Sequence, residues 1–348
     1  MCNIAGYTGY RNAAPILLEM LKRQEYLDGG LSTGIATIHE GKLYSAKVLG
    51  NVQDLIEKTD ALKFPGTTGI IHSRPDDNYI EFAHPFLSED KKTAVVCNGN
   101  ACTDEHLKEI RNSLVRYLKN RCNIEFESAV SLPHKSTYPE LSEGIYVPYA
   151  ETIAKTVEQI RRGGGASYEE ALADASSKLF ADVVNVMVSA NSPGNIYVAR
   201  ITRPMNIMAA EGECYISTSQ FGFPEIENVK YVKSLPQMKS CVINKDGYIE
   251  TDYTVSGGKV TEFTKEEYDN IKNAIKRNLS ESWHCMDNMG GGIFVTDRSA
   301  DKLRPNVKAV YDVLWELHKE GILKSELRDS TIPWLPGKTV KRLFFHID

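Results

Sequence analysis

The chain has 348 residues, 42% hydrophobic and 25% charged, which is enough to bury a substantial core in one large domain with an appendage, or in two domains. Its formal net charge of -5 and its mixture of both signs offer no basic stripe for nucleic acid. No apolar segment is long enough to cross a bilayer, and the N-terminus lacks the pattern of a signal peptide, so we expect neither nucleic acid nor a membrane as a partner.

Cysteine usage points to a reducing compartment. The seven cysteines are scattered, odd in number and without CxxC spacing. This pattern disfavours a zinc site or a disulfide framework, and it fits free thiols in the cytoplasm.

Secondary structure follows from the hydrophobic periodicity, taken in chain order. Apolar residues at helical spacing predict helices, with Pro15 near the first start and a Ser167–Glu170 capping box at another. The predicted helices cover 13–27, 104–121, 149–162, 167–180, 264–283 and 306–322. Runs rich in β-branched residues predict strands over 31–38, 42–50, 66–74, 93–100, 182–190, 195–202, 213–219 and 240–250, the last with an Asp246-Gly247 hairpin signal.

These elements divide the chain near residue 260. Helices between two blocks of strands argue for a layered α/β or α+β domain over 1–260. The remainder, 261–348, is predicted to be an extension of mixed helix and loop, with a glycine-rich loop over 288–305. Its aromatic end could dock a partner or pack back on the core, which is the more common fate of an apolar helix face.

The start of the chain, "MCNIAGYTG", raises the first chemical possibility. Removal of Met1 would leave Cys2 with a thiol and a free α-amine, whose reference pKa values of about 8.5 and about 7.7–8.0 allow both to titrate near neutrality. The amine can then accept the thiol proton and activate the sulfur as a nucleophile. The alternative is that Cys2 is a small buried residue at the start of a strand.

Two further strand ends carry groups that attack on an amide would need. The Asn98 carboxamide and the Gly99 amide in "VVCNGN" could bind an oxyanion, although Asn-Gly is also a common turn. Arg74 follows His72 and Ser73, and its guanidinium has a forked set of donors that suits a carboxylate. The alternative is that Arg74 is a solvated surface arginine. A histidine is not required by this mechanism, so His72 and His84 are more simply structural.

The order and spacing of these motifs resemble the class II glutamine amidotransferase domain, most closely the glutaminase domain of glucosamine-6-phosphate synthase. The resemblance covers residues 2–260 and rests on "MCNIAGYTG", "QEYLDGGLSTGIA", "GTTGIIHSRP", "FAHPF" and "AVVCNGN". It implies an α+β, four-layer αββα sandwich, the N-terminal nucleophile hydrolase fold. In full-length members of this family a sugar-phosphate isomerase domain consumes the ammonia, whereas the pattern after residue 260 leads us to expect a C-terminal helical extension without that domain.

The resemblance also implies roles for single residues. Cys2 would be the nucleophile and its own amine the base, while Asn98 and Gly99 would hold the oxyanion. Arg74, with His72 and Ser73 beside it, would bind the substrate. The implied reaction releases ammonia from L-glutamine without a cofactor or a metal, for a separate synthase subunit, and it leaves room for a homo-oligomer.

This chain departs from the family pattern at several positions. The arginine of the family's EYRG stretch corresponds to Leu27, and the histidine before the oxyanion asparagine to Cys97. The family's aspartate that binds the substrate α-amine aligns with Ser131 or with Tyr149, depending on the alignment. Its loss forfeits a charge-assisted hydrogen bond of about 1.5–3 kcal/mol, which a nearby carboxylate could restore. The candidates are Glu127, Glu140, Glu143 and Glu151.

Three functions are therefore open. The protein is a glutamine amidotransferase subunit, an N-terminal nucleophile hydrolase acting on another amide, or a non-catalytic regulatory module on the same scaffold. The joint presence of Cys2, Arg74, Asn98 and Gly99 favours catalysis, and we place glutamine first.

Overall fold

The computed structural model describes residues 2–75, 79–132, 136–289, 299–332 and 335–348. Within these ranges one antiparallel sheet has seven strands. Their order is β14 (Tyr231–Ser234), β12 (Asn206–Ala210), β13 (Glu213–Ser217), β1 (Asn3–Thr8), β4 (Thr68–Arg74), β2 (Ser32–His39) and β3 (Lys42–Leu49). The strand that follows Cys2 therefore lies at the centre of this sheet, directly beside the strand that ends at Arg74.

A second antiparallel sheet carries the Asn98–Gly99 pair. In the described residues its order is β16 (Gly247–Thr254), β15 (Lys239–Asn244), β11 (Ile196–Arg200), β10 (Ala181–Ser189), β6 (Thr93–Ala101) and β5 (Phe86–Leu87). The two sheets stack face to face because each turns an apolar face inward, with Ile4, Ile70, Val96 and Val186 among the buried residues between them. The core between the sheets thus joins β1 and β4 to β6 and β10.

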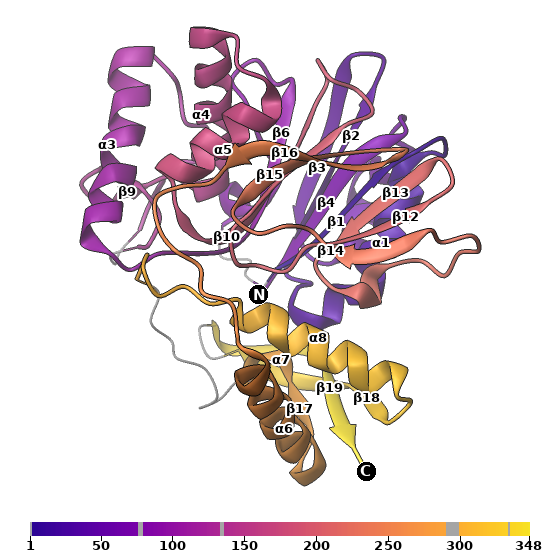
Figure 1. Ribbon diagram of the computed structural model, residues 1–348. Coiled ribbons are helices and arrows are strands. Elements are labelled where there is room, and N and C mark those ends of the chain that lie inside the picture. Colours follow the sequence, from indigo (N-terminus) through magenta and orange to yellow (C-terminus); the bar gives the residue numbers. More distant parts are fainter. Residues whose placement is uncertain (1, 76–78, 133–135, 290–298, 333–334) are drawn as a thin grey trace.

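Helices cover the outer faces of both sheets (Figure 1). On the first sheet lie α1 (Ala13–Asp28) and α2 (Val52–Lys58), and the Asn12 side chain caps α1 by accepting from the Ala14 N–H. On the second lie α4 (Tyr149–Gly164) and α5 (Tyr168–Lys178), with α3 (Glu105–Cys122) beside α4. Short elements complete this part: η1 (Ala61–Lys63), η2 (Ile80–Phe82), η3 (Gln220–Gly222), β7 (Val130–Ser131), β8 (Glu140–Ser142) and β9 (Ile145–Tyr146). The four-layer αββα sandwich expected from the sequence is confirmed.

The C-terminal extension differs in part from its prediction. It contains the expected helices α6 (Lys265–Glu281) and α8 (Asn306–Lys319), with the short α7 (Met286–Met289). It also contains a sheet in the order β17 (His284–Cys285), β19 (Leu335–Ile347) and β18 (Leu323–Ile332), so a description as helix and loop alone is wrong. These elements group at one end of the sandwich in Figure 1. Of the predicted loop 288–305, residues 290–298 lie outside the described residues.

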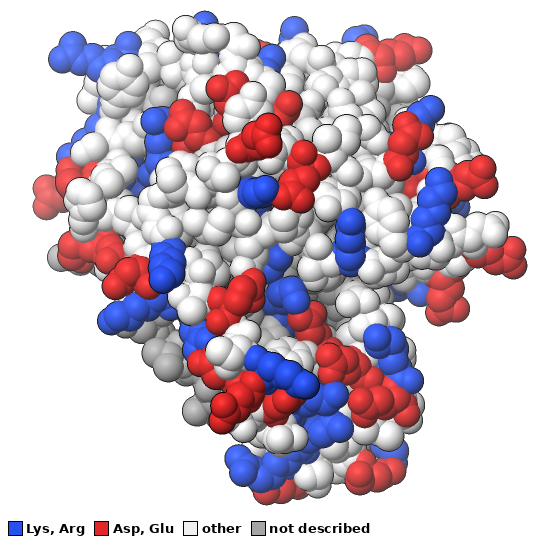
Figure 2. All heavy atoms as spheres, viewed as in Figure 1, with Lys and Arg blue, Asp and Glu red and all other residues white. Residues whose placement is uncertain are grey.

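The predicted boundary near residue 260 falls between β16, which ends at Thr254, and α6, which begins at Lys265. The division into two domains stays a prediction. On the face shown in Figure 2, acidic and basic side chains are interspersed, most densely over the C-terminal elements. Every helix in the described ranges is too short or too polar to cross a bilayer.

Candidate active site

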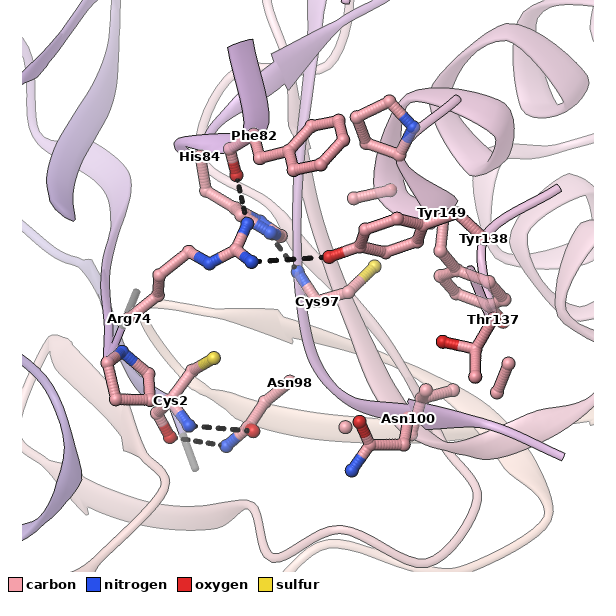
Figure 3. Close-up of a pocket in the computed structure, with 16 residues that line it drawn as sticks. Cys2, Arg74, Phe82, His84, Cys97, Asn98, Asn100, Thr137, Tyr138 and Tyr149 are labelled. Atoms are coloured by element: carbon pink, nitrogen blue, oxygen red, sulfur yellow. Dashed lines mark hydrogen bonds between the residues drawn. The ribbon is translucent and has the colours of Figure 1, made fainter. Parts of the chain in front are cut away.

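Cys2 and Asn98 meet at the junction of the two sheets. Cys2 precedes β1, and Asn98 lies within β6, where it is fully buried. The Cys2 nitrogen donates to Asn98 Oδ1 at 3.2 Å, and Asn98 Nδ2 donates to the Cys2 carbonyl oxygen at 2.6 Å. One side chain therefore holds the backbone of the predicted nucleophile at two points. Figure 3 shows the Cys2 sulfur pointing into the space between Arg74 and Asn98.

Gly99 occupies a position that only glycine can fill without strain. Its φ of +138° lies in a region that residues with a Cβ rarely adopt, and a Cβ built there would lie 2.0 Å from the Asp182 carbonyl oxygen. The neighbouring strand β10 is the cause, since Gly99 pairs with Val183 across the ladder. The backbone at the predicted oxyanion site is thus fixed by close packing against β10.

Arg74 reaches the same space from the end of β4. Its Nη1 donates to the Phe82 carbonyl oxygen at 2.7 Å, and its Nη2 donates to the Tyr138 hydroxyl at 3.3 Å. The guanidinium also lies 5.8 Å from the centre of the Phe82 ring. These contacts orient a half-buried cation at the edge of the site, where a carboxylate of a ligand could pair with it.

These four residues line one cavity of about 410 Å³, within the size range of small-molecule sites. The structure thus brings Cys2, Arg74, Asn98 and Gly99 together, as the sequence predicted, while their chemical roles stay predictions. The rest of the described lining is formed by Pro75, Phe82, His84, Cys97, Asn100, Ala101, Thr137, Tyr138, Pro148, Tyr149, Ala150 and Val183.

The placement of His72 and Ser73 corrects their predicted role. Both lie in β4, are at most 1% exposed and do not line the cavity. Ser73 Oγ accepts from the Gly30 N–H at 2.7 Å. Ser73 points to the opposite face of β4 from Arg74, because alternate residues of a strand point to opposite faces of the sheet. His72 lies on the same face as Arg74 but sits behind His84, whose ring stacks on it and lines the cavity. We therefore withdraw direct substrate contact for these two residues.

Two stacked imidazoles fix the backbone before Asn98. The rings of His72 and His84 lie 3.9 Å apart, and His72 Nε2 donates to the Cys97 carbonyl oxygen at 3.0 Å. The Cys97 N–H in turn donates to His84 Nδ1 at 3.2 Å. Burial, with nearby Arg74, lowers the pKa of His72 to about 3, and burial lowers the pKa of His84 well below its usual value. Both rings are neutral near pH 7, which agrees with the structural role expected for histidines here.

Cys97 places a second thiol on the cavity wall, and sequence reasoning gave it no function. Its Sγ donates to Asn185 Oδ1 at 2.8 Å, and burial raises its pKa well above the usual value. A thiol held in this form is a poor nucleophile near neutral pH. The sequence signal that could have identified Cys97 is its place directly before Asn98. That place predicts that the thiol lies near the site, but it does not predict the protonation state of the thiol.

Neither alignment position for the α-amine anchor provides a carboxylate. Tyr149 lines the cavity and donates from its hydroxyl to the Leu179 carbonyl oxygen at 2.7 Å, whereas Ser131 does not line it. Of the compensating candidates, Glu151 accepts from the Glu127 and Ser128 N–H groups at 2.7 and 3.2 Å and so is engaged elsewhere. Glu127, Glu140 and Glu143 also lie outside the lining. Among the described lining residues, the ionised side chain is Arg74, with no acidic partner for a substrate ammonium.

The fold is that of the N-terminal nucleophile hydrolases, and comparison with known proteins agrees with this fold. No family model matches the chain. The glutamine–fructose-6-phosphate aminotransferase (isomerizing) of Pyrococcus horikoshii is 31% identical over 224 residues, which are 63% of this chain and 32% of the relative. The Thermococcus kodakarensis protein of the same name is 29% identical over 255 residues, 72% of this chain and 37% of the relative. The chain thus matches about a third of the length of these relatives.

Solved structures support the fold. The glutamine phosphoribosylpyrophosphate amidotransferase from B. subtilis superposes with a TM-score of 0.57 at 16% identity, covering 93% of this chain and 66% of that one. A structure described as the allosteric regulatory enzyme of purine biosynthesis gives 0.54, also at 16% identity, covering 81% of this chain and 59% of that one. The resemblance to class II glutamine amidotransferases and the N-terminal nucleophile hydrolase fold are confirmed.

Proposed function

We propose that this protein hydrolyses the side-chain amide of L-glutamine with Cys2 as an N-terminal nucleophile and releases ammonia. The observation that carries the proposal is the convergence of Cys2, Asn98, Gly99 and Arg74 on one cavity. The named relatives, whose names include glutamine, support glutamine as the substrate. Met1 lies outside the described residues, and its removal is part of the proposal.

The contacts of Cys2 suit the two-step chemistry. A neutral α-amine that donates one N–H to Asn98 Oδ1 keeps its lone pair, which accepts the thiol proton directly or through a water. The Cys2 sulfur then attacks the amide carbon, the C–N bond breaks, and the nitrogen leaves as ammonia after the amine returns the proton. Water hydrolyses the resulting γ-glutamyl thioester, which yields glutamate and restores the thiol.

Asn98 and Gly99 would stabilise the charge that forms in both steps. A carboxamide nitrogen carries two N–H groups, so its bond to the Cys2 carbonyl leaves the second for the oxyanion. The Gly99 N–H would supply the other donor. Arg74 would pair with the α-carboxylate of glutamine and hold the side-chain amide over Cys2.

The test is glutamate release from glutamine by protein purified with Cys2 at its N-terminus. We expect turnover by the wild type and its loss in Cys2→Ala, whereas Cys122→Ala, a half-buried thiol outside the cavity, should keep wild-type turnover. A wild-type protein that binds glutamine without releasing glutamate would contradict the proposal.

A second candidate is hydrolysis of a different amide by the same residues. The observation in its favour is the described cavity lining, in which the ionised group is the cation Arg74 and no carboxylate faces a substrate ammonium. A monocarboxylate amide without an α-amine, such as glutaramate, would leave no charge unpaired. A kcat/KM for glutaramate above that for glutamine would favour this candidate.

The names of the relatives describe an aminotransferase and an amidotransferase. We therefore propose an ammonia-accepting synthase subunit as the partner, and a homo-oligomer stays an expectation. Thiol chemistry requires Cys2 to be reduced, so we expect the protein to work in the cytoplasm.

A further inference from the structure

The C-terminal end of α1 and the C-terminal extension each bury a side chain against the other. Leu27, near the end of α1, is 1% exposed and belongs to the hydrophobic cluster of the extension, which includes Ile275 and Leu314. Arg342 of β19 points the other way and inserts into the turn that follows α1. The extension and the sandwich are therefore joined by an apolar contact and a polar one at the same turn.

Arg342 is held at that turn by charge and by a hydrogen bond. It is 1% exposed, and its Nη1 donates to the Gly29 carbonyl oxygen at 2.8 Å. Its Nη2 lies 3.8 Å from the carboxylate of Asp28, which is 2% exposed. Removing one partner of such a buried pair is costly, because the other charge is left out of water without compensation. The turn therefore depends on a residue 313 positions away in the sequence.

The same turn contacts the strand that presents Arg74. The Gly30 N–H donates to Ser73 Oγ at 2.7 Å, and the Leu31 N–H donates to the Arg74 carbonyl oxygen at 3.1 Å. Leu31 also packs against Val340, two residues before Arg342 on β19. A path of contacts thus runs from the extension, through two residues of the turn, to the backbone of Arg74.

The turn is also tied to the residue after the predicted nucleophile. Asn3 Nδ2 donates to the carbonyl oxygens of Gln24 and Glu25, in the last turns of α1, at 3.0 and 3.4 Å. Asn3 pairs with Ser73 across the β1–β4 ladder. The end of α1 and the turn after it therefore contact both strand ends at the site, the start of β1 through Asn3 and the end of β4 through Ser73.

We infer that Arg342 is a positioning residue, through which the C-terminal extension holds the α1–β2 turn and thereby Arg74 in its binding geometry. The effect on glutamine rests on the proposed function, whereas the effect on the turn does not. Loss of Arg342 leaves the Arg74 guanidinium, which would bind the substrate carboxylate, less firmly positioned. The sulfur of Cys2 stays in place, since Asn98 holds that residue from the other sheet.

Hydrogen exchange tests the structural part without any substrate. We compare the wild type with Arg342→Gln, Arg342→Lys and the control Lys341→Ala, whose side chain pairs with Asp329 on the exposed face of the hairpin. A peptide spanning 28–33 should exchange about tenfold faster in Arg342→Gln, because local opening becomes easier when a buried pair is broken. Arg342→Lys should fall between, and Lys341→Ala should match the wild type. Unchanged exchange in that peptide, or equal loss of protection in β10, would overturn the inference.

Alkylation of Cys2 tests the functional part on the same variants. An electrophilic glutamine analogue carries the carboxylate that Arg74 would bind, whereas iodoacetamide does not. Arg342→Gln should lower the rate with the analogue about ten- to a hundredfold, as expected for a misplaced binding group, and leave the rate with iodoacetamide unchanged. Equal rates with the analogue in wild type and variant would overturn the inference. A wild type that reacts with iodoacetamide but not with the analogue would instead refute the proposed function, and hydrogen exchange would still decide the role of Arg342.

Discussion

Asn98 bonds to both backbone polar groups of Cys2: its Oδ1 accepts from the Cys2 nitrogen at 3.2 Å, and its Nδ2 donates to the Cys2 carbonyl oxygen at 2.6 Å. Cys2 directly precedes β1 of the first sheet, Asn98 lies in β6 of the second, and the two residues are 96 positions apart in the sequence. The stacking of the sheets therefore determines the distance between the predicted nucleophile and the predicted oxyanion donor. Changes at either residue should affect chemistry more than folding.

Asn98→Ala should lower kcat for glutamine by about 10²- to 10³-fold, because it removes one oxyanion donor and both hydrogen bonds to Cys2. Asn98→Asp keeps an acceptor for the Cys2 nitrogen but lacks the donor, so it should be nearly as inactive. Steady-state glutamate release is the measurement, with Asn120→Ala, at an exposed position of α3 outside the cavity, as the control. Wild-type kcat in Asn98→Ala would exclude a catalytic role for this side chain.

Gly99→Ala should destabilise the protein by about 1–3 kcal/mol, since the new Cβ combines an unfavourable backbone conformation with a clash against the Asp182 carbonyl oxygen. Activity should fall as well, because the strand must shift at the oxyanion site. The matched control is Gly163→Ala, where a Cβ meets nothing within 4 Å in helix α4, and which should be neutral or stabilising by about 0.5–1 kcal/mol. Denaturant unfolding distinguishes the two, and equal stability of both variants would contradict the strain described here.

Arg74→Gln should raise KM for glutamine by about ten- to a hundredfold while kcat changes less, because it removes a charge-assisted contact to the substrate carboxylate. Arg74→Lys should recover only part of the loss, since an ammonium lacks the fork that contacts Phe82 and Tyr138. An unchanged KM with a reduced kcat would contradict the binding role of Arg74 and would indicate a catalytic role instead.

His72→Asn should alter how stability depends on pH. In the unfolded chain this imidazole gains a proton near pH 6.5, whereas in the folded protein burial and Arg74 hold its pKa at about 3. Its contribution to stability is thus complete above pH 6.5 and is lost as pH falls towards 3, with a slope of up to about 1.4 kcal/mol per pH unit.

Asn has no such titration, so the free-energy difference between wild type and His72→Asn should shrink as pH decreases through this window. Urea unfolding at several pH values measures it. His106→Asn, at an exposed ring, provides the comparison. Parallel curves for wild type and His72→Asn would show that this histidine is not held neutral.

Much of the sandwich could be predicted from sequence because its signals are local. The apolar spacing around Leu17 and Leu21 predicts α1, and the β-branched runs that end at Arg74 and Asn98 predict β4 and β6. The order of the motifs also predicted correctly that Cys2, Arg74, Asn98 and Gly99 lie close together. Placing His72 and Ser73 at the cavity failed for two reasons. Alternation along β4 turns Ser73 away from the face of Arg74, and the ring of His84, a residue distant in sequence, lies between His72 and the cavity.

The extension was harder to predict because its strands carry a weak sequence signal and one of its buried contacts depends on a distant partner. The segment containing Leu327 is charged and largely exposed, so it lacks the alternation of apolar and polar residues that predicts a strand, and it pairs as β18 with the adjacent strand β19. Likewise, nothing near Arg342 in the sequence indicates that it will be buried beside Asp28 and Gly29. Long-range pairing of this kind leaves no periodic signal in a single chain.

The central claim is that Cys2, freed of Met1, is the nucleophile, and intact mass tests it most directly. Native protein is incubated with an electrophilic glutamine analogue, and peptide fragmentation then locates the label. The account predicts a chain that begins at Cys2 and carries one analogue on that residue, with no label in Cys2→Ala. A chain that retains Met1, or a label that persists in Cys2→Ala, would contradict it.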